Sequence, residues 1–168
     1  FYIDIFETSG EVAAIVIPSR LGTPWKPAHL NYTQAVQVCT GLGKRLPTRE
    51  EWMAAASNMG QNTNYTLRGD NIKDANGTLI PHIAGSRGSN AIAVTDDKQL
   101  GIDACGTVGM TGNRAEWVIE PKDNTSWQCG SYYDQPNISH VTLANICSNN
   151  PYQVTSTATA RCVVDYSP

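Results

Sequence analysis

The sequence contains little charge. Only 16% of its 168 residues are charged, with 12 basic and 15 acidic side chains, a net charge of −3 and no Lys/Arg cluster; soluble domains average about 25% charged residues. Surfaces that bind nucleic acid or anionic membranes need concentrated positive charge. We therefore expect no nucleic-acid partner.

Long apolar runs are absent as well. The longest run, Val12–Ile17, falls far short of the roughly 18 residues that suggest a membrane-spanning helix, so we expect no membrane insertion. The length, with no internal repeat and no linker, favours one domain. The chain starts at Phe1 without Met or a signal peptide, and we expect it to be the C-terminal part of a longer protein.

Metal-binding cysteine patterns are missing. No CxxC pair occurs and no histidine lies at ligand spacing from a cysteine, which disfavours a zinc cluster. Wide spacing in a chain rich in Asn, Ser, Thr and Gly favours disulfides and an extracellular setting, although five reduced, buried thiols stay open as an alternative. The odd count leaves at least one thiol unpaired. The cysteines are Cys39, Cys105, Cys129, Cys147 and Cys162.

Two helices are predicted in the first third of the chain. Asn31 resembles an N-cap for Tyr32–Thr40, in which four residues share one face at spacings of three and four. Thr48 and Glu51 form a capping box for a second helix that should end near Met59–Gly60. The four residues of the first helix face are Tyr32, Ala35, Val36 and Cys39.

The other expected elements are short strands. Phe1–Phe6 alternates apolar and polar residues, and Val12–Ile17 is rich in β-branched residues. Asn76-Gly77 favours a hairpin turn. Two early helices with many short strands and long loops predict an α+β domain. Further strands are expected at Gly106–Met110, Glu116–Ile119 and Ala160–Val164.

Several stretches, taken in order, resemble one family. Gly43–Trp52 (GKRLPTREEW) and Gly109–Trp117 (GMTGNRAEW) are similar to two elements of formylglycine-generating enzymes and sulfatase-modifying-factor domains. Phe1–Asp4 and Ala160–Val163 resemble the opening and closing strands. Gly109 stands where that family usually has Asp, and Arg114 where it usually has Val.

The resemblance implies a fold and a core. The fold is a single C-type lectin domain of the formylglycine-generating-enzyme subtype over residues 1–168, with two helices, small antiparallel sheets, long loops and paired termini. Glu116 and Asn113 are expected to hold buried loop backbone. The expected core anchors are Leu46, Trp52, Trp117 and Val118.

The resemblance also implies which cysteines form disulfides. C-type lectin folds join the first helix to the last strand, which implies a bridge between Cys39 and Cys162. Cys129 and Cys147 are then the second pair, and Cys105 is left over.

Catalysis is not expected. The family oxidises a substrate cysteine with two cysteines and copper, and soft Cu(I) needs sulfur ligands. In the matching run, Gly130–Ser139, the two cysteine positions hold Asp134 and Ser139. We therefore predict no catalytic residue, no metal site and no cofactor. A divergent iron- or copper-dependent oxidase of the same superfamily stays open as the alternative.

A nearly uncharged segment is the predicted binding surface. Gln128–Ala160 holds one charged residue, Asp134, whereas Asn, Ser and Thr fill 12 positions beside three tyrosines. Tyr with small hydrogen-bonding residues is typical of antibody-like binding surfaces. The predicted ligand-binding residues are Trp127, Tyr132, Tyr133, Asp134, Asn137, Ser139, His140, Asn145, Asn149, Asn150 and Tyr152.

This segment resembles a second group of proteins. Most of its residues between Tyr132 and Tyr152 can be reached from an Asn AAC codon by changing only adenines, as in the variable proteins of diversity-generating retroelements. The resemblance implies a non-enzymatic domain that displays a variable surface, outside the cell or on a virion, to a protein or glycan on a cell surface. An undiversified neutral loop and an intimin- or invasin-type adhesin tip stay open.

Overall fold

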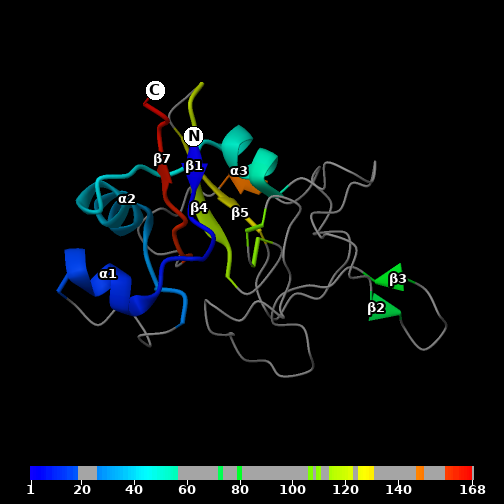
Figure 1. Cartoon of the computed structure of the whole chain (residues 1–168), viewed down its shortest axis with the longest axis horizontal. Helices are drawn as coiled ribbons and strands as arrows, with labels where there is room; N and C mark the ends of the chain where they lie inside the picture. Colours follow the sequence, from blue (N-terminus) through cyan, green and yellow to red (C-terminus); the bar gives the residue numbers. More distant parts are fainter. Residues whose placement is uncertain are drawn as a thin grey trace.

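The protein is an α+β domain with small antiparallel sheets. The computed structural model describes residues 1–18, 26–56, 106–107, 109–110, 114–122, 125–130, 147–149 and 158–167, together with the backbone of 72–73 and 79–80. Its helices are α1 (Gly10–Val16), α2 (Tyr32–Gly41) and α3 (Arg49–Ala56) (Figure 1). Its strands are β1 (Tyr2–Ile3), β2 (Ile72–Lys73), β3 (Leu79–Ile80), β4 (Glu116–Glu120), β5 (Thr125–Cys129), β6 (Cys147–Asn149) and β7 (Val163–Val164).

The central sheet has the order β4-β5-β6, and helices lie on both of its faces. Trp117 packs with α2 residues such as Ala35 and Val38. Its neighbour Val118, on the opposite face, packs with Trp52 and Ala55 of α3. Successive side chains of a strand point to opposite faces, and both faces of β4 are buried. This alternation gives the domain two hydrophobic clusters, one on each side of β4.

The chain ends pair with each other. β1 is antiparallel to β7, with Tyr2 opposite Val164 and Ile3 opposite Val163. The N- and C-terminal labels accordingly lie close together at the top of Figure 1. The expected pairing of the termini is confirmed, although the strands are shorter than the predicted Phe1–Phe6 and Ala160–Val164.

Helix α1 corrects the prediction of a strand over Val12–Ile17 and of only two helices. Ser9 caps α1, accepting a hydrogen bond from the Val12 amide at 3.2 Å, and Ala13 is fully buried. Ile15 is 73% exposed, whereas Ala13, Val16 and Ile17 face the core, which is the pattern of a helix and not of a core strand. The β-branched composition favoured a strand, but the cap and the packing of α1 on α2 decide the local structure.

The capping predictions for the other two helices are confirmed. Asn31 and Gln34 form a reciprocal capping box at the start of α2. The Thr48 amide donates to Glu51 Oε2 at 2.8 Å, and the Glu51 amide donates to Thr48 Oγ1 at 3.1 Å. The predicted end of α3 near residues 59–60 lies outside the described residues.

Two smaller predictions are corrected, and a third agrees with the structure. Val36 is 38% exposed, and Val38 takes its place on the buried face of α2 beside Ala35 and Cys39. The described residues of 106–110 form no strand, because Gly106 and Gly109 adopt positive φ angles of 85° and 80°. The antiparallel pairing of β2 and β3 agrees with a hairpin here, while Asn76-Gly77 itself lies outside the described residues.

Both implied disulfides are present. Cys39 of α2 is bonded to Cys162 just before β7, and Cys129 is bonded to Cys147. The expected anchors Leu46, Trp52, Trp117 and Val118 are all buried.

Candidate ligand-binding site

A buried ion pair holds the elements beneath the site. The Arg161 guanidinium is fully buried and contacts Glu116 Oε1 at 2.7 Å through Nη2. Trp52 of α3 donates its indole N–H to the same carboxylate, and Arg161 Nη1 donates to the carbonyls of Asp4 and Ile5. Among the described residues, the Glu116 carboxylate binds these two side chains, and the loop backbone that it was expected to hold lies outside the described residues. One carboxylate therefore joins α3, β4 and the final segment of the chain, and Arg161 extends this connection to the N-terminal segment.

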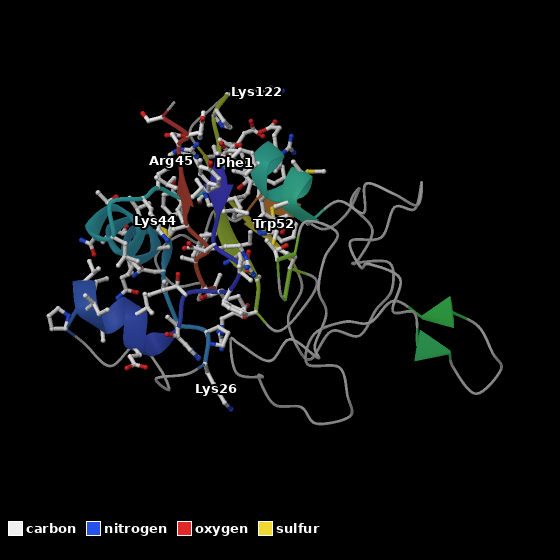
Figure 2. All side chains as sticks on the ribbon, viewed as in Figure 1. Phe1, Lys26, Lys44, Arg45, Trp52 and Lys122 are labelled. Carbon is white, nitrogen blue, oxygen red and sulfur yellow. A yellow bond between two sulfur atoms is a disulfide. The ribbon has the colours of Figure 1, made fainter. Side chains whose placement is uncertain are left out.

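A second charged network lies at the end of the domain where the chain termini pair. Figure 2 shows Arg45 at the same end of the domain as Phe1. The Arg45 guanidinium makes two 2.7 Å bonds to the Glu51 carboxylate and also binds Asp165. The hydrogen bonds from Arg45 hold the pKa of both carboxyl groups below their ordinary values. Glu51 therefore serves two purposes, capping α3 and fixing Arg45, whose backbone also pairs with Val163.

Trp127 is the first predicted ligand residue that the structure places. It lies in β5, half-buried, and packs at the edge of the cluster formed by Trp52 and Val118. The Arg49 guanidinium lies 4.9 Å from the centre of its ring, a cation–π distance, and Arg49 Nε is 3.1 Å from Glu120 Oε2. The Trp127 ring is therefore held between α3 and the sheet.

Asn149 is the other predicted ligand residue within the described part of the chain. It is exposed in β6 and lies opposite Trp127 in the register, so both side chains point to the same face. Two residue pairs further along, Cys129 and Cys147 are also directly opposite and are joined by their disulfide. Trp127, Asn149 and this disulfide together form the base of the candidate site.

Gly130 fixes the exit of the chain from β5. Its φ is +83°, and a Cβ atom there would lie 3.0 Å from the Met110 carbonyl oxygen and 3.7 Å from Trp52. Any other residue would be both strained and crowded. The segment that follows therefore starts from a fixed position against the core.

The remaining predicted site residues lie outside the described residues, so the structure neither gathers nor separates them. Asp134 and Ser139, at the two catalytic positions of the family, are among them. The full set is Tyr132, Tyr133, Asp134, Asn137, Ser139, His140, Asn145, Asn150 and Tyr152, together with Cys105 and Asn113.

One polar cluster was not predicted from the sequence. Arg114, 5% exposed, lies 2.8 Å through Nη2 from His29 Nε2. Burial, and then the charge of Arg114, lowers the pKa of His29. Glu7 and its neighbour Thr8 are buried as well. A Cβ atom on Gly109 would lie 3.6 Å from Glu7 Oε2. The signal was present in the two departures from the family pattern, because Arg114 lies against His29 and Gly109 lies against the buried Glu7 carboxylate.

The described part of the chain has neither a cation site nor a membrane-spanning helix. No group of three His, Cys, Asp or Glu side chains there could hold a metal ion. None of its helices has the length and apolar character needed to cross a bilayer. The contacts among these elements can orient side chains and present them at the surface.

Comparison with known proteins identifies the family. A search of curated proteins finds no match. The family model for the sulfatase-modifying factor enzyme 1-like domain matches residues 18–166. This span contains α2, α3, both disulfides and the Glu116–Arg161 pair. The chain belongs to the family of sulfatase-modifying factor enzyme 1-like domains.

Proposed function

We propose that this domain is a non-enzymatic binding module that presents the residues between Trp127 and Tyr152 to a protein or glycan on a cell surface. One observation supports the proposal: the domain has a well-bonded buried core, whereas sulfur is missing at the two positions that the resemblance matches with the family's cysteines. Glu116, Arg161 and Trp52 form a fully bonded buried core. The two positions where the family has its cysteines hold Asp134 and Ser139, which cannot bind Cu(I) through sulfur.

The composition of the segment supports binding through neutral contacts. Gln128–Ala160 contains one charged residue, and tyrosine rings with amides and hydroxyls can stack and hydrogen-bond with little loss of conformational entropy. The cation that contacts Trp127, Arg49, is already paired with Glu120 and stacked on the Trp127 ring. In this proposal the whole chain is one C-type lectin domain of the formylglycine-generating-enzyme subtype, and no cofactor takes part.

The setting follows from the disulfides. Two disulfides indicate an oxidising compartment. We extend this to display outside the cell or on a virion, as in the variable proteins of diversity-generating retroelements. The coding DNA tests that assignment: a near-identical template copy nearby, differing mainly at adenines, is expected, and a genome without one contradicts it.

Binding is tested with the purified, disulfide-intact domain, labelled and applied to an array of cell-surface glycoproteins and glycans. We expect saturable binding to a small set of spots. The Tyr132→Ala/Tyr133→Ala/His140→Ala variant should lose at least tenfold in affinity. The matched control, Tyr2→Ala/Tyr166→Ala, changes two exposed rings at the paired termini and should bind normally. Equal loss in both variants, or no saturable binding, contradicts the proposal.

The oxidase alternative has a separate test. The domain is incubated with copper, oxygen and a cysteine-containing sulfatase peptide, and the peptide is analysed by mass spectrometry. We expect no conversion of the cysteine to an aldehyde and no stoichiometric metal in the purified protein. Formation of aldehyde would restore the enzyme assignment.

A further inference from the structure

The two disulfides differ in burial. Cys39 and Cys162 are both fully buried, within the cluster that also holds Ala35, Val38 and Trp117. Cys129 is fully buried too, but its partner Cys147 is only partly buried at the edge of the second cluster. A thiolate must reach a disulfide sulfur in order to attack it, so Cys147 is the accessible end of the second bridge.

The two disulfides also differ in the length of the loop that each one closes. The Cys39–Cys162 bridge joins residues 123 positions apart and connects α2 with the segment that holds Arg161 and β7. The Cys129–Cys147 bridge spans only 18 positions. The residues between Cys129 and Cys147 include seven of the predicted ligand residues, which are Tyr132, Tyr133, Asp134, Asn137, Ser139, His140 and Asn145.

The contacts on each side of the second bridge are unequal. β5 is held to β4 by five residue pairs and to α3 by the Arg49–Trp127 stack. β6 is held to β5 by three residue pairs, one of which is the disulfide itself. Breaking this bond therefore leaves β5 in place and removes the only covalent tie between β5 and β6 other than the chain that connects them.

We propose that Cys129–Cys147 is a redox-sensitive bond that controls the proposed binding surface, while Cys39–Cys162 keeps the domain folded. The proposal rests on the binding function above. An external dithiol supplies the electrons. One of its thiolates attacks Cys147 Sγ, the Cys129–Cys147 bond breaks, and Cys129 leaves as a thiolate that takes up a proton. The second thiol of the dithiol then displaces Cys147, which gives two protein thiols and one oxidised dithiol.

The order of reduction follows from burial and loop length together. A buried bridge that closes a long loop is stabilised by the whole folded state, whereas a bridge across two strands at an edge opens with only local loss of structure. We expect Cys129–Cys147 to be reduced at a dithiol concentration about tenfold lower than Cys39–Cys162.

The test is a titration of the folded domain with dithiothreitol. Free thiols, including Cys105, are first blocked with one alkylating reagent, and newly formed thiols are labelled with a second reagent and located by peptide mass spectrometry. Cys129 and Cys147 should be labelled first, while the thermal transition remains cooperative. Labelling of all four together, or of Cys39 and Cys162 first, overturns the proposal.

Two double variants complete the design. Cys129→Ser/Cys147→Ser should fold and lose the low-concentration labelling step, whereas Cys39→Ser/Cys162→Ser should retain that step if it folds. Ligand binding on the array is measured on the partly reduced domain, and we expect at least a tenfold loss. Should the labelling order hold while the oxidised domain binds nothing, the binding function fails and the redox order stands. Should the oxidised and partly reduced domains bind equally, the control of binding is wrong.

Discussion

Glu116 and Arg161 are the charged pair on which the centre of the domain depends. Their side chains are 1% and 0% exposed, and each makes several hydrogen bonds to different parts of the chain. A buried ion pair is not in itself strongly stabilising, because both charges lose their hydration. Removal of one partner is costly, because the other charge is left buried and uncompensated.

Glu116→Gln should therefore be severely destabilising. We expect a loss of about 3–5 kcal/mol in the free energy of unfolding, measured by chemical denaturation, because the buried Arg161 would keep its charge and lose the carboxylate charge that it contacts. Glu50→Gln is the matched control: Glu50 is exposed and lies 3.9 Å from Arg49, so its loss should cost less than about 1 kcal/mol. Similar losses in both variants would mean that Glu116 is not the central anion.

His29 makes stability depend on pH. Its pKa in the folded domain lies below the ordinary value of 6.5, because burial and Arg114 both disfavour the charged ring. As the pH falls through 6.5, the unfolded chain takes up the proton before the folded domain does. The stability that His29 contributes is therefore complete above pH 6.5 and is lost at lower pH.

His29→Gln keeps a hydrogen-bond acceptor near Arg114 and removes the titration. We expect the variant to show a shallower fall in melting temperature between pH 7.5 and 5.5 than the wild-type domain, with little change at pH 7.5. The effect should be small, because the His29 side chain is largely exposed. An unchanged slope would assign the pH dependence to other groups.

At the scale of elements, α1 and α2 approach each other closely at Gly41. A Cβ atom on Gly41 would lie 2.4 Å from Val16 Cγ1. Valine is stiff about χ1, so its methyl groups cannot turn aside at little cost.

Gly41→Ala should consequently destabilise the domain by about 1–3 kcal/mol, although alanine ordinarily stabilises a helix relative to glycine. The Gly41→Ala/Val16→Ala variant should recover part of the loss, because it removes the clashing methyl groups. Thermal unfolding of the two variants and of Val16→Ala alone gives the coupling between the sites. An additive result would show that the two helices do not meet here.

Elements with strong local signals could be predicted from the sequence. The capping boxes at Asn31 and Thr48 are satisfied by residues three positions along, and they set the starts of α2 and α3. Trp52 and Trp117 were expected in the core because they are large apolar residues beside turn or cap signals. For α1 a comparable signal, Ser9 followed by Glu11 in the first turn, was outweighed by the β-branched residues after it.

Long-range contacts could not be derived from local pattern. β6 has three residues and owes its place to pairing with β5 and to a disulfide 18 positions away. The pairing of Arg114 with His29 joins positions 85 residues apart, and neither residue is unusual in its own surroundings. The Arg49–Trp127 stack likewise depends on how α3 meets the sheet. Of the predicted site residues, the structure places Trp127 and Asn149, which lie opposite each other in β5 and β6.

For the whole molecule, the two disulfides should contribute unequally to stability. The chain-entropy model gives about 5 kcal/mol for the long loop closed by Cys39–Cys162 and about 3 kcal/mol for the short loop closed by Cys129–Cys147. The bridges join residues 123 and 18 positions apart.

Cys39→Ser/Cys162→Ser should therefore lower the free energy of unfolding more than Cys129→Ser/Cys147→Ser does, by about 2 kcal/mol. Urea denaturation of the oxidised variants measures both. The comparison fails if the short-loop variant is the less stable of the two, which would place the main covalent support of the fold in the binding segment.

The paired termini also have a mechanical consequence. In β1 and β7 the antiparallel register puts Tyr2 opposite Val164, so a force that draws the two ends apart loads the outermost backbone bonds first and peels the strands. On the β7 side peeling stops at Cys162, where the disulfide passes the load to α2. A domain tethered at both ends under tension, as on a surface in flow, would thus yield by a few residues at low force and then resist. Residues 40–161 lie between the two bridged cysteines and are therefore outside the covalent path that carries the load.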